Sequence, residues 1–302
     1  MVKRVNLTMR LTSPIKSKAW AGRAKTRAPV NLNVSIRNAL ISLNGIKIMY
    51  FEEFGPNDGT PIVFLHGSMV AGWMWMGQVN DLSEYRCILP DLPGVGNSAT
   101  ESWISFTDTS DKIANIIREK CTDRKAHIVG LSLGGITALH VAANHPEVVQ
   151  SLIVSGVPYG KVHPLLRMLS FIMLKLYSRP WGAGAIARLL SIPRDESMGA
   201  FMKTAEQTDV ISLQTLTREV FASSFPQSLK IVTVPALAVV GQNDTAPAKR
   251  AVSYIQSVMP NARGYIIPGV GHQWNAENSE LFSEMIRSWV SSETVTDRFL
   301  RV

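Results

Sequence analysis

The stretch His127–Gly135 (HIVGLSLGG) decides the fold, because an apolar run ends there in a serine that glycines surround. We predict a strand that stops at Gly130, a helix that starts near Gly134 and a very tight turn at Ser132 between them. Residues without a Cβ atom let two backbone segments pass this closely. The turn therefore presents the Ser132 hydroxyl beyond the strand, next to the positive end of a helix.

Short apolar runs alternate with amphipathic stretches on both sides of this turn. The expected strands are a hairpin over Ser35–Phe54 around Asn44-Gly45, followed by Pro61–Leu65, Tyr85–Leu89, Ala126–Val129, Val149–Val154, Pro235–Val240 and Gly264–Ile267. The expected helices are Asp108–Cys121, Gly135–Asn144, Ala248–Met259 and Glu277–Ser291. Continuous apolar strands are typical of a sheet covered on both faces. The pattern predicts an α/β fold with a mostly parallel eight-stranded sheet flanked by helices.

Residues 160–229 interrupt this alternation with several helical segments and no clear strand. A connection of this length is too long for an ordinary loop. We expect it to form a helical lid inserted between strands six and seven. The core then comprises residues 35–159 and 230–302.

The net charge of +8 lies in the first residues of the chain. Residues 1–34 hold eight of the 31 cations and no acid, which leaves 23 cations against 23 acids in the body. This basic extension is predicted to be disordered. The predicted localisation is cytoplasmic, with the basic extension as a disordered tail. The alternative is a mitochondrial or plastid protein, because an Arg-rich, acid-free N-terminal segment is typical of a transit peptide. No nucleic-acid partner is expected, since the body is neutral and shows no basic-aromatic face. No transmembrane segment is expected either.

A serine hydroxyl becomes a nucleophile when a histidine takes its proton and a carboxylate holds that histidine. His272 lies in a loop just past the last strand, where an open α/β sheet gathers its ligand groups. Asp244 directly follows the strand Pro235–Val240 and so reaches the same edge. Of the other five histidines, we interpret His127, His140, His145 and His163 as structural or surface groups. The candidate catalytic residues are therefore Ser132, Asp244 and His272.

Acyl transfer also needs hydrogen-bond donors for the oxyanion of the tetrahedral intermediate. Candidate donors are the backbone N–H of Leu133 and, from the loop after the strand Pro61–Leu65, Ser68 or alternatively Met69. The segment around 165–176 is apolar nearly all round, so we expect it to be buried and to roof an apolar cavity. The predicted pocket residues are Trp73, Trp75, Trp274, Met168, Phe171 and Ile172. The alternative for that apolar face is contact with a membrane or a second subunit.

Five motifs occur in one order along residues 38–292, and with them the chain resembles the α/β-hydrolase superfamily. They are VFLHGS (63–68), PDLPGVGNS (90–98), GLSLGG (130–135), GQND (241–244) and GVGHQW (269–274). The resemblance implies an esterase-like serine hydrolase with a lid, but it does not name a substrate. No cofactor and no metal are expected, because the sequence shows no metal-binding or nucleotide-binding motif. The apolar lid segment favours cleavage of an ester or related acyl bond of a small hydrophobic substrate. A carbon–carbon bond hydrolase on the same triad and a hydrolase-like ligand receptor with little turnover stay open as alternatives. The oligomeric state is not predicted.

Overall fold

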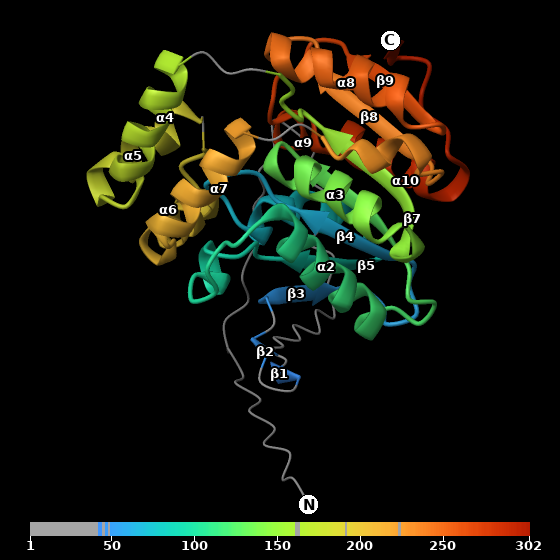
Figure 1. Ribbon diagram of the computed structural model, residues 1–302. Helices are drawn as coiled ribbons and strands as arrows, with labels where there is room; N and C mark the ends of the chain where they lie inside the picture. The colour runs from blue at the N-terminus through green and yellow to red at the C-terminus, as the bar shows by residue number, and fades with distance from the viewer. Residues whose placement is uncertain (1–41, 44–45, 48, 161–163, 191, 223–224) are drawn as a thin grey trace, which may run out of the picture.

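The computed structural model describes residues 42–43, 46–47, 49–160, 164–190, 192–222 and 225–302, so the basic extension 1–34 and His163 lie outside the described part. Its main element is an eight-stranded sheet in the order β10-β9-β8-β7-β6-β4-β5-β3 (Figure 1). The strands are β3 (Phe51–Phe54), β4 (Pro61–Leu65), β5 (Arg86–Pro90), β6 (Ala126–Leu131), β7 (Val149–Ser155), β8 (Ala236–Gly241), β9 (Ala262–Ile267) and β10 (Leu300–Arg301). Neighbouring strands are parallel except at the two edges, where β3 and β10 run antiparallel to their partners. The predicted α/β sheet is confirmed.

The edges of the sheet differ from the expectation in one respect. Within the predicted hairpin, β1 (Ser42–Leu43) and β2 (Ile46–Lys47) pair only with each other, and β3 after them joins the main sheet beside β5. The predicted turn residues, 44 and 45, lie outside the described residues. The eighth strand is instead β10 near the C-terminus. Two exposed residues carry no apolar periodicity, which is why the sequence pattern did not indicate this strand.

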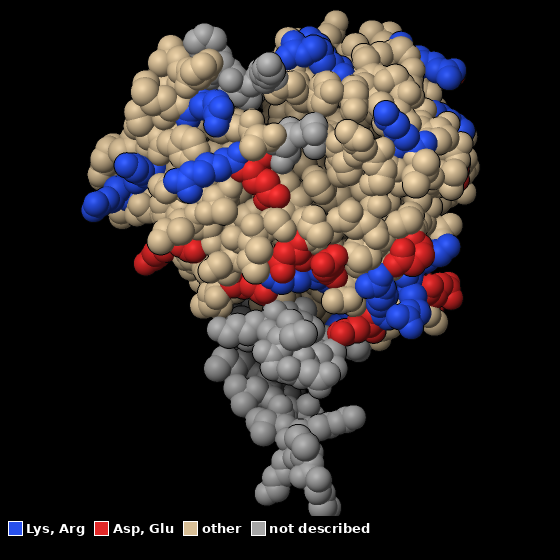
Figure 2. Space-filling view, in the orientation of Figure 1, with Lys and Arg blue, Asp and Glu red and all other residues tan. Residues whose placement is uncertain are grey.

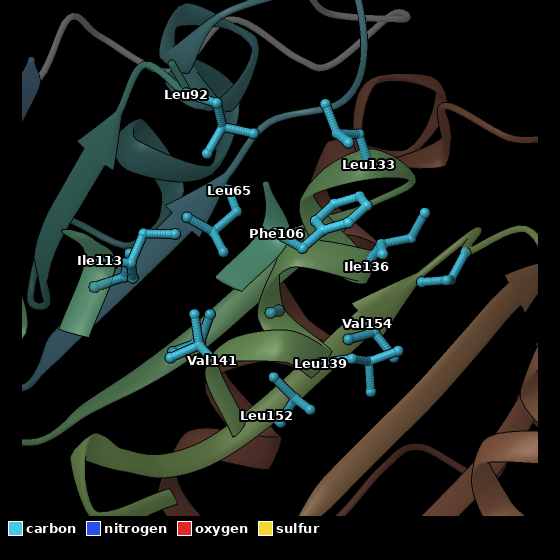
Figure 3. Close-up of a cluster of buried hydrophobic side chains, with 14 of the residues drawn as sticks. Leu65, Leu92, Phe106, Ile113, Leu133, Ile136, Leu139, Val141, Leu152 and Val154 are labelled. Carbon is cyan, nitrogen blue, oxygen red and sulfur yellow. The ribbon is translucent and has the colours of Figure 1, made fainter. Parts of the chain in front are cut away.

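Helices cover both faces of the sheet. On one face lie α2 (Phe106–Lys120), α3 (Leu133–Asn144) and α8 (Ala246–Val258), and on the other lie α1 (Met76–Asp81), α9 (Trp274–Glu277) and α10 (Ser279–Ser292). Successive residues of each strand point to opposite faces, so β8 contributes alternate side chains to the two cores. Figure 3 shows Leu139 and Val141 of α3 beside Leu152 and Val154 of β7 in the first of these cores. Short 3₁₀ turns occur at η1 (Gly72–Trp75), η2 (Gly96–Ser98), η3 (Pro146–Val148) and η4 (Gln227–Ile231).

Between β7 and β8 the described residues form four α-helices, which we call the helical insertion. They are α4 (Pro164–Tyr177), α5 (Pro180–Leu189), α6 (Glu196–Gln207) and α7 (Val210–Ala222), and they lie to one side of the sheet (Figure 1). Hydrogen bonds attach α7 to the core: the Trp103 indole donates to Glu219 at 2.8 Å, and the Asp209 N–H donates to the Gly94 carbonyl at 2.9 Å. Among the described helices none has both the length and the apolar character to cross a membrane.

Candidate active site

The turn at Ser132 has the strained geometry that its glycine neighbours predict. Ser132 lies between the end of β6 and the first residue of α3, with φ +56° and ψ −113°, a conformation that L-residues rarely adopt. A Cβ atom on Gly130 would lie 2.3 Å from the Gly134 carbonyl oxygen, and one on Gly134 would lie 2.0 Å from the Leu65 carbonyl oxygen. The close approach of the helix to two strands therefore requires glycine at both positions. The strained turn places the serine at the carboxyl ends of the parallel strands.

Asp244 and His272 form a hydrogen-bonded pair at the same edge. Asp244 follows β8, its side chain is 0% exposed, and its Oδ2 accepts the His272 Nδ1 proton at 2.8 Å. The other oxygen, Oδ1, accepts the Thr245 backbone N–H at 2.6 Å. Because Asp244 engages Nδ1, the Nε2 atom of His272 is left to exchange a proton, and the His272 side chain is 40% exposed. The pair has the arrangement of a base and its orienting carboxylate.

The end of β7 connects Ser132 to this pair. The Ser132 N–H donates to the Ser155 carbonyl at 2.8 Å, and Gly156 follows directly with φ +60°. A Cβ atom at Gly156 would lie 3.0 Å from two atoms of the His272 ring and 3.2 Å from Asp244 Oδ2. Within the described residues no hydrogen bond joins Ser132 Oγ to His272, and such bonds often tighten only when substrate binds. Sequence reasoning missed Gly156, although a glycine after a buried strand was a signal for such a close approach.

Three backbone N–H groups are candidate donors for the oxyanion. Leu133 is the first residue of α3, and its N–H finds no acceptor in the part of the chain that the structure describes. In the loop after β4, Ser68 is exposed and Met69 is buried with φ +62°, and neither N–H has an acceptor among the described residues. The N–H groups of Ser68 and Met69 stay the two candidates for the second donor.

His66 shapes the loop that carries these donors. Its Nδ1 donates to the Gly67 carbonyl at 2.8 Å, and its Nε2 accepts the Leu92 N–H at 2.8 Å, which defines a neutral ring with the proton on Nδ1. Complete burial lowers the pKa of His66, consistent with that neutral form. Asp91 braces the same region, because its carboxylate accepts the N–H groups of Gly72 and Asn97 at 2.9 Å each. Both residues stabilise the loop and touch no candidate reacting atom.

The helical insertion is attached to this loop at two points. The hydroxyl of Tyr177, the last residue of α4, donates to the Met69 carbonyl at 2.8 Å. The Trp73 indole donates to Thr204 Oγ1 of α6 at 2.9 Å. Burial raises the pKa of Tyr177, so the hydroxyl keeps the proton that it donates. Tyr177 was not among the predicted site residues; a tyrosine that closes an apolar run was the available signal, because a buried hydroxyl needs a partner.

The predicted pocket residues separate into three groups. Trp73 is half-buried beside the candidate oxyanion loop, and Phe171 is half-buried within the insertion against Phe221, with 6.3 Å between ring centroids. Trp75 and Trp274 are fully buried in the core on the α10 side, where both contact Phe282, so they brace the sheet instead of facing a cavity. Met168 and Ile172 are exposed to solvent, because α4 packs mainly on α5 and α7 and buries its opposite face. The expectation that this helix is buried on most sides was therefore wrong.

The other described histidines have structural environments. His127 bonds Ser151 inside the sheet at 2.7 Å, His140 stacks on Phe106 with ring centroids 4.7 Å apart, and His145 meets Asp111 at the surface at 2.6 Å. Within the described residues no three His, Cys, Asp or Glu side chains gather as metal ligands would.

Comparisons with known proteins place the chain in a family. A family model described as the alpha/beta hydrolase fold matches residues 60–208. The AB hydrolase superfamily protein of Gibberella zeae is 27% identical over 89% of this chain and 90% of its own length. The pimeloyl-[acyl-carrier protein] methyl ester esterase of Aeromonas hydrophila is 43% identical over 34% of this chain and 39% of its own length. Among solved structures, a thermophilic esterase from Thermogutta terrifontis matches 84% of this chain and 97% of its own with a TM-score of 0.68 at 22% identity.

The chain belongs to the α/β-hydrolase superfamily. It is a hydrolase that resembles the esterases of that superfamily.

Proposed function

We propose that this hydrolase cleaves a carboxylic ester or a related acyl bond of a small hydrophobic substrate through an acyl-enzyme on Ser132. The observation that carries the proposal is the Asp244–His272 hydrogen bond at the sheet edge where the strained turn presents Ser132. The methyl ester esterase of Aeromonas hydrophila supports the choice of an ester, because it is 43% identical over 34% of this chain.

In the proposed mechanism, Ser132 Oγ attacks the substrate carbonyl carbon while His272 Nε2 takes the serine proton. Asp244 holds the ring and stabilises its charged form, and the Leu133 N–H with one N–H of Ser68 or Met69 receives the oxyanion. His272 then gives its proton to the departing alcohol, and the acyl group stays on Ser132. A water molecule, deprotonated by His272, attacks the acyl-enzyme and restores the serine.

A hydrophobic acyl group is proposed because the groups around the serine turn are apolar. Leu133 and Val157 lie beside the turn, and Met69 and Trp73 line the candidate oxyanion loop. The helical insertion is proposed to act as a lid, since Tyr177 connects it to that loop.

The test is labelling by a fluorophosphonate probe together with turnover of p-nitrophenyl esters of rising acyl length. We expect the wild type to be labelled and Ser132→Ala to be unlabelled, with kcat for the ester reduced by at least about 10³-fold. Ser68→Ala is the matched control, because a backbone donor survives loss of the hydroxyl. A folded wild type that takes no label contradicts the proposal. Labelling without ester turnover would contradict the ester assignment and favour a ligand receptor. Labelling with faster cleavage of a carbon–carbon bond in a diketone-like substrate would favour a carbon–carbon bond hydrolase.

A further inference from the structure

The outer side of the helical insertion carries bulky apolar side chains in solvent. On α4, positions 165, 168, 169 and 172 recur at the spacing that puts residues on one helix face. The exposed fractions there and on the adjoining α5 are Leu165 53%, Met168 53%, Leu169 48%, Ile172 47%, Trp181 68% and Leu189 73%. We call Met168, Leu169, Ile172, Trp181 and Leu189 the apolar outer face. Several bulky apolar side chains exposed on two adjoining helices are a feature of interaction surfaces more often than of ordinary protein surface.

The two helices that carry the apolar outer face hold charges of one sign. Residues 164–190 contain four cations, all exposed, and no acid: Arg167, Lys175, Arg179 and Arg188. Figure 2 shows blue side chains among tan atoms over this end of the insertion. At the contact between α4 and α7, the guanidinium of Arg218 lies 5.6 Å from the Phe171 ring and that of Arg167 lies 5.7 Å from the Phe221 ring. The surface is therefore amphipathic and positive.

We propose that the apolar outer face, with these four cations, docks the protein on an anionic lipid bilayer, with α4 and α5 lying in the interface plane. Cations beside exposed apolar side chains are the combination that such a surface binds, since headgroup phosphates attract the cations and the acyl boundary takes up the apolar groups. At 14 residues, α4 is too short to span the bilayer.

A second copy of the chain fits this surface less well. In a two-fold dimer the same patch meets itself, so the four cations of one copy would lie against the four of the other without an acid to separate them. An anionic bilayer removes that repulsion. The inference rests only on exposure and charge, so it does not depend on the chemistry proposed for Ser132.

The test is co-sedimentation of the full chain with phosphatidylcholine vesicles, with and without about one quarter phosphatidylserine. We expect the anionic vesicles to bind at least about tenfold more tightly, because each cation near such a surface contributes roughly fivefold. Met168→Gln/Leu169→Gln/Ile172→Gln and, separately, Lys175→Gln/Arg179→Gln/Arg188→Gln should each weaken binding by about tenfold or more. Ile231→Gln and Lys125→Gln/Arg298→Gln are matched controls at exposed positions outside α4 and α5, and we expect them to bind within about twofold of the wild type. Thermal unfolding checks that every variant folds.

A second readout reports on the proposed face directly. Lipids with brominated acyl chains should quench Trp181, so Trp181→Phe should lose most of the quenching while Trp20→Phe, in the basic extension, keeps it. Equal vesicle binding by the wild type and both triple variants would assign binding to the basic extension and overturn the proposal. Failure of the wild type to bind, or a dimer that the same variants dissociate, overturns it as well.

Discussion

At the residue scale, the sequence motifs indicated the candidate catalytic side chains, but they did not indicate the residues that position those side chains. Asp244 and His272 were expected at the same sheet edge because each follows a parallel strand. In the structure a hydrogen bond connects their side chains. The catalytic roles stay a proposal. The role of Gly156 was not predicted, because it depends on which side chain packs against this glycine. That side chain is His272, which lies in a loop more than 100 residues later in the chain. Trp75 and Trp274 were misplaced for the opposite reason: nearness in sequence to the motif does not tell which sheet face a side chain joins.

Gly156→Ala tests the packing beside the candidate base. The added methyl group meets the His272 ring at 3.0 Å, and the positive φ strains any L-residue there. We expect kcat to fall by about 10 to 100-fold, because the ring of the proposed base shifts, and stability to fall by about 1–3 kcal/mol. Ester turnover and urea denaturation measure the two effects.

Gly199→Ala is the matched control for that substitution. Gly199 lies exposed in α6 with nothing within 4 Å of an added Cβ atom, so alanine should raise stability by about 0.5–1 kcal/mol and leave kcat unchanged. If Gly156→Ala behaves like Gly199→Ala, the packing argument fails.

His140 should make stability depend on acid pH. Burial lowers the pKa of His140 from 6.5 to about 4, and its Nε2 has no partner within the described residues. Between these two values the unfolded chain binds the proton and the folded chain does not, so stability is full above pH 6.5 and falls as the pH drops toward 4. His140→Phe keeps the stacking on Phe106 and should reduce the loss between pH 7 and pH 4.5 by about 2 kcal/mol. Urea denaturation at both pH values measures this, and an unchanged loss would contradict the assignment.

At the element scale, apolar periodicity located the central elements well and their ends less well. The predicted strand Val149–Val154 ends one residue later, and the predicted helix start at Asp108 lies at Phe106, where the Ser105 hydroxyl caps the helix by accepting the Asp108 N–H at 3.1 Å. Caps of this kind carry a short local signal that an apolar run does not contain. The attachment of α4 to the candidate oxyanion loop had no sequence signal of its own, because it joins residues 108 positions apart.

Tyr177→Phe tests whether that attachment positions the loop. The variant removes only the hydroxyl that donates to the Met69 carbonyl at 2.8 Å. If the bond holds the N–H groups of the loop toward the oxyanion, kcat should fall by about three- to tenfold while KM changes less than about twofold. Tyr265→Phe, a partly buried tyrosine on β9, is the control and should leave both constants as they are. A rise in KM alone, or a loss of stability with unchanged kcat, would make Tyr177 a purely structural residue.

At the scale of the whole molecule, the helical insertion is held to the core unevenly. On the α6–α7 side, Thr204, Asp209 and Glu219 each hydrogen-bond the core, and Glu219 accepts the Phe106 N–H at the start of α2. On the α4–α5 side the described attachment to the core is the Tyr177 hydroxyl. No sequence pattern predicts this division, since each contact joins the insertion to residues about 100 or more positions away.

Hydrogen exchange should reveal the division directly. A helix that few hydrogen bonds attach to the core opens locally at a small free energy, so amides of α4 and α5 should exchange about 10 to 100-fold faster than those of α7, and α7 should be protected together with α2. Glu219→Gln weakens the bonds from α7 to Trp103 and Phe106 and should speed exchange in α7 and in the first turn of α2 alike. Peptide-resolved exchange measured by mass spectrometry gives both comparisons. Equal protection across all four insertion helices would mean that the insertion opens as one unit. An effect of Glu219→Gln confined to α7 would mean that its hydrogen bonds do not couple α7 to α2. Either outcome would contradict the prediction that these hydrogen bonds set the local stability of the insertion.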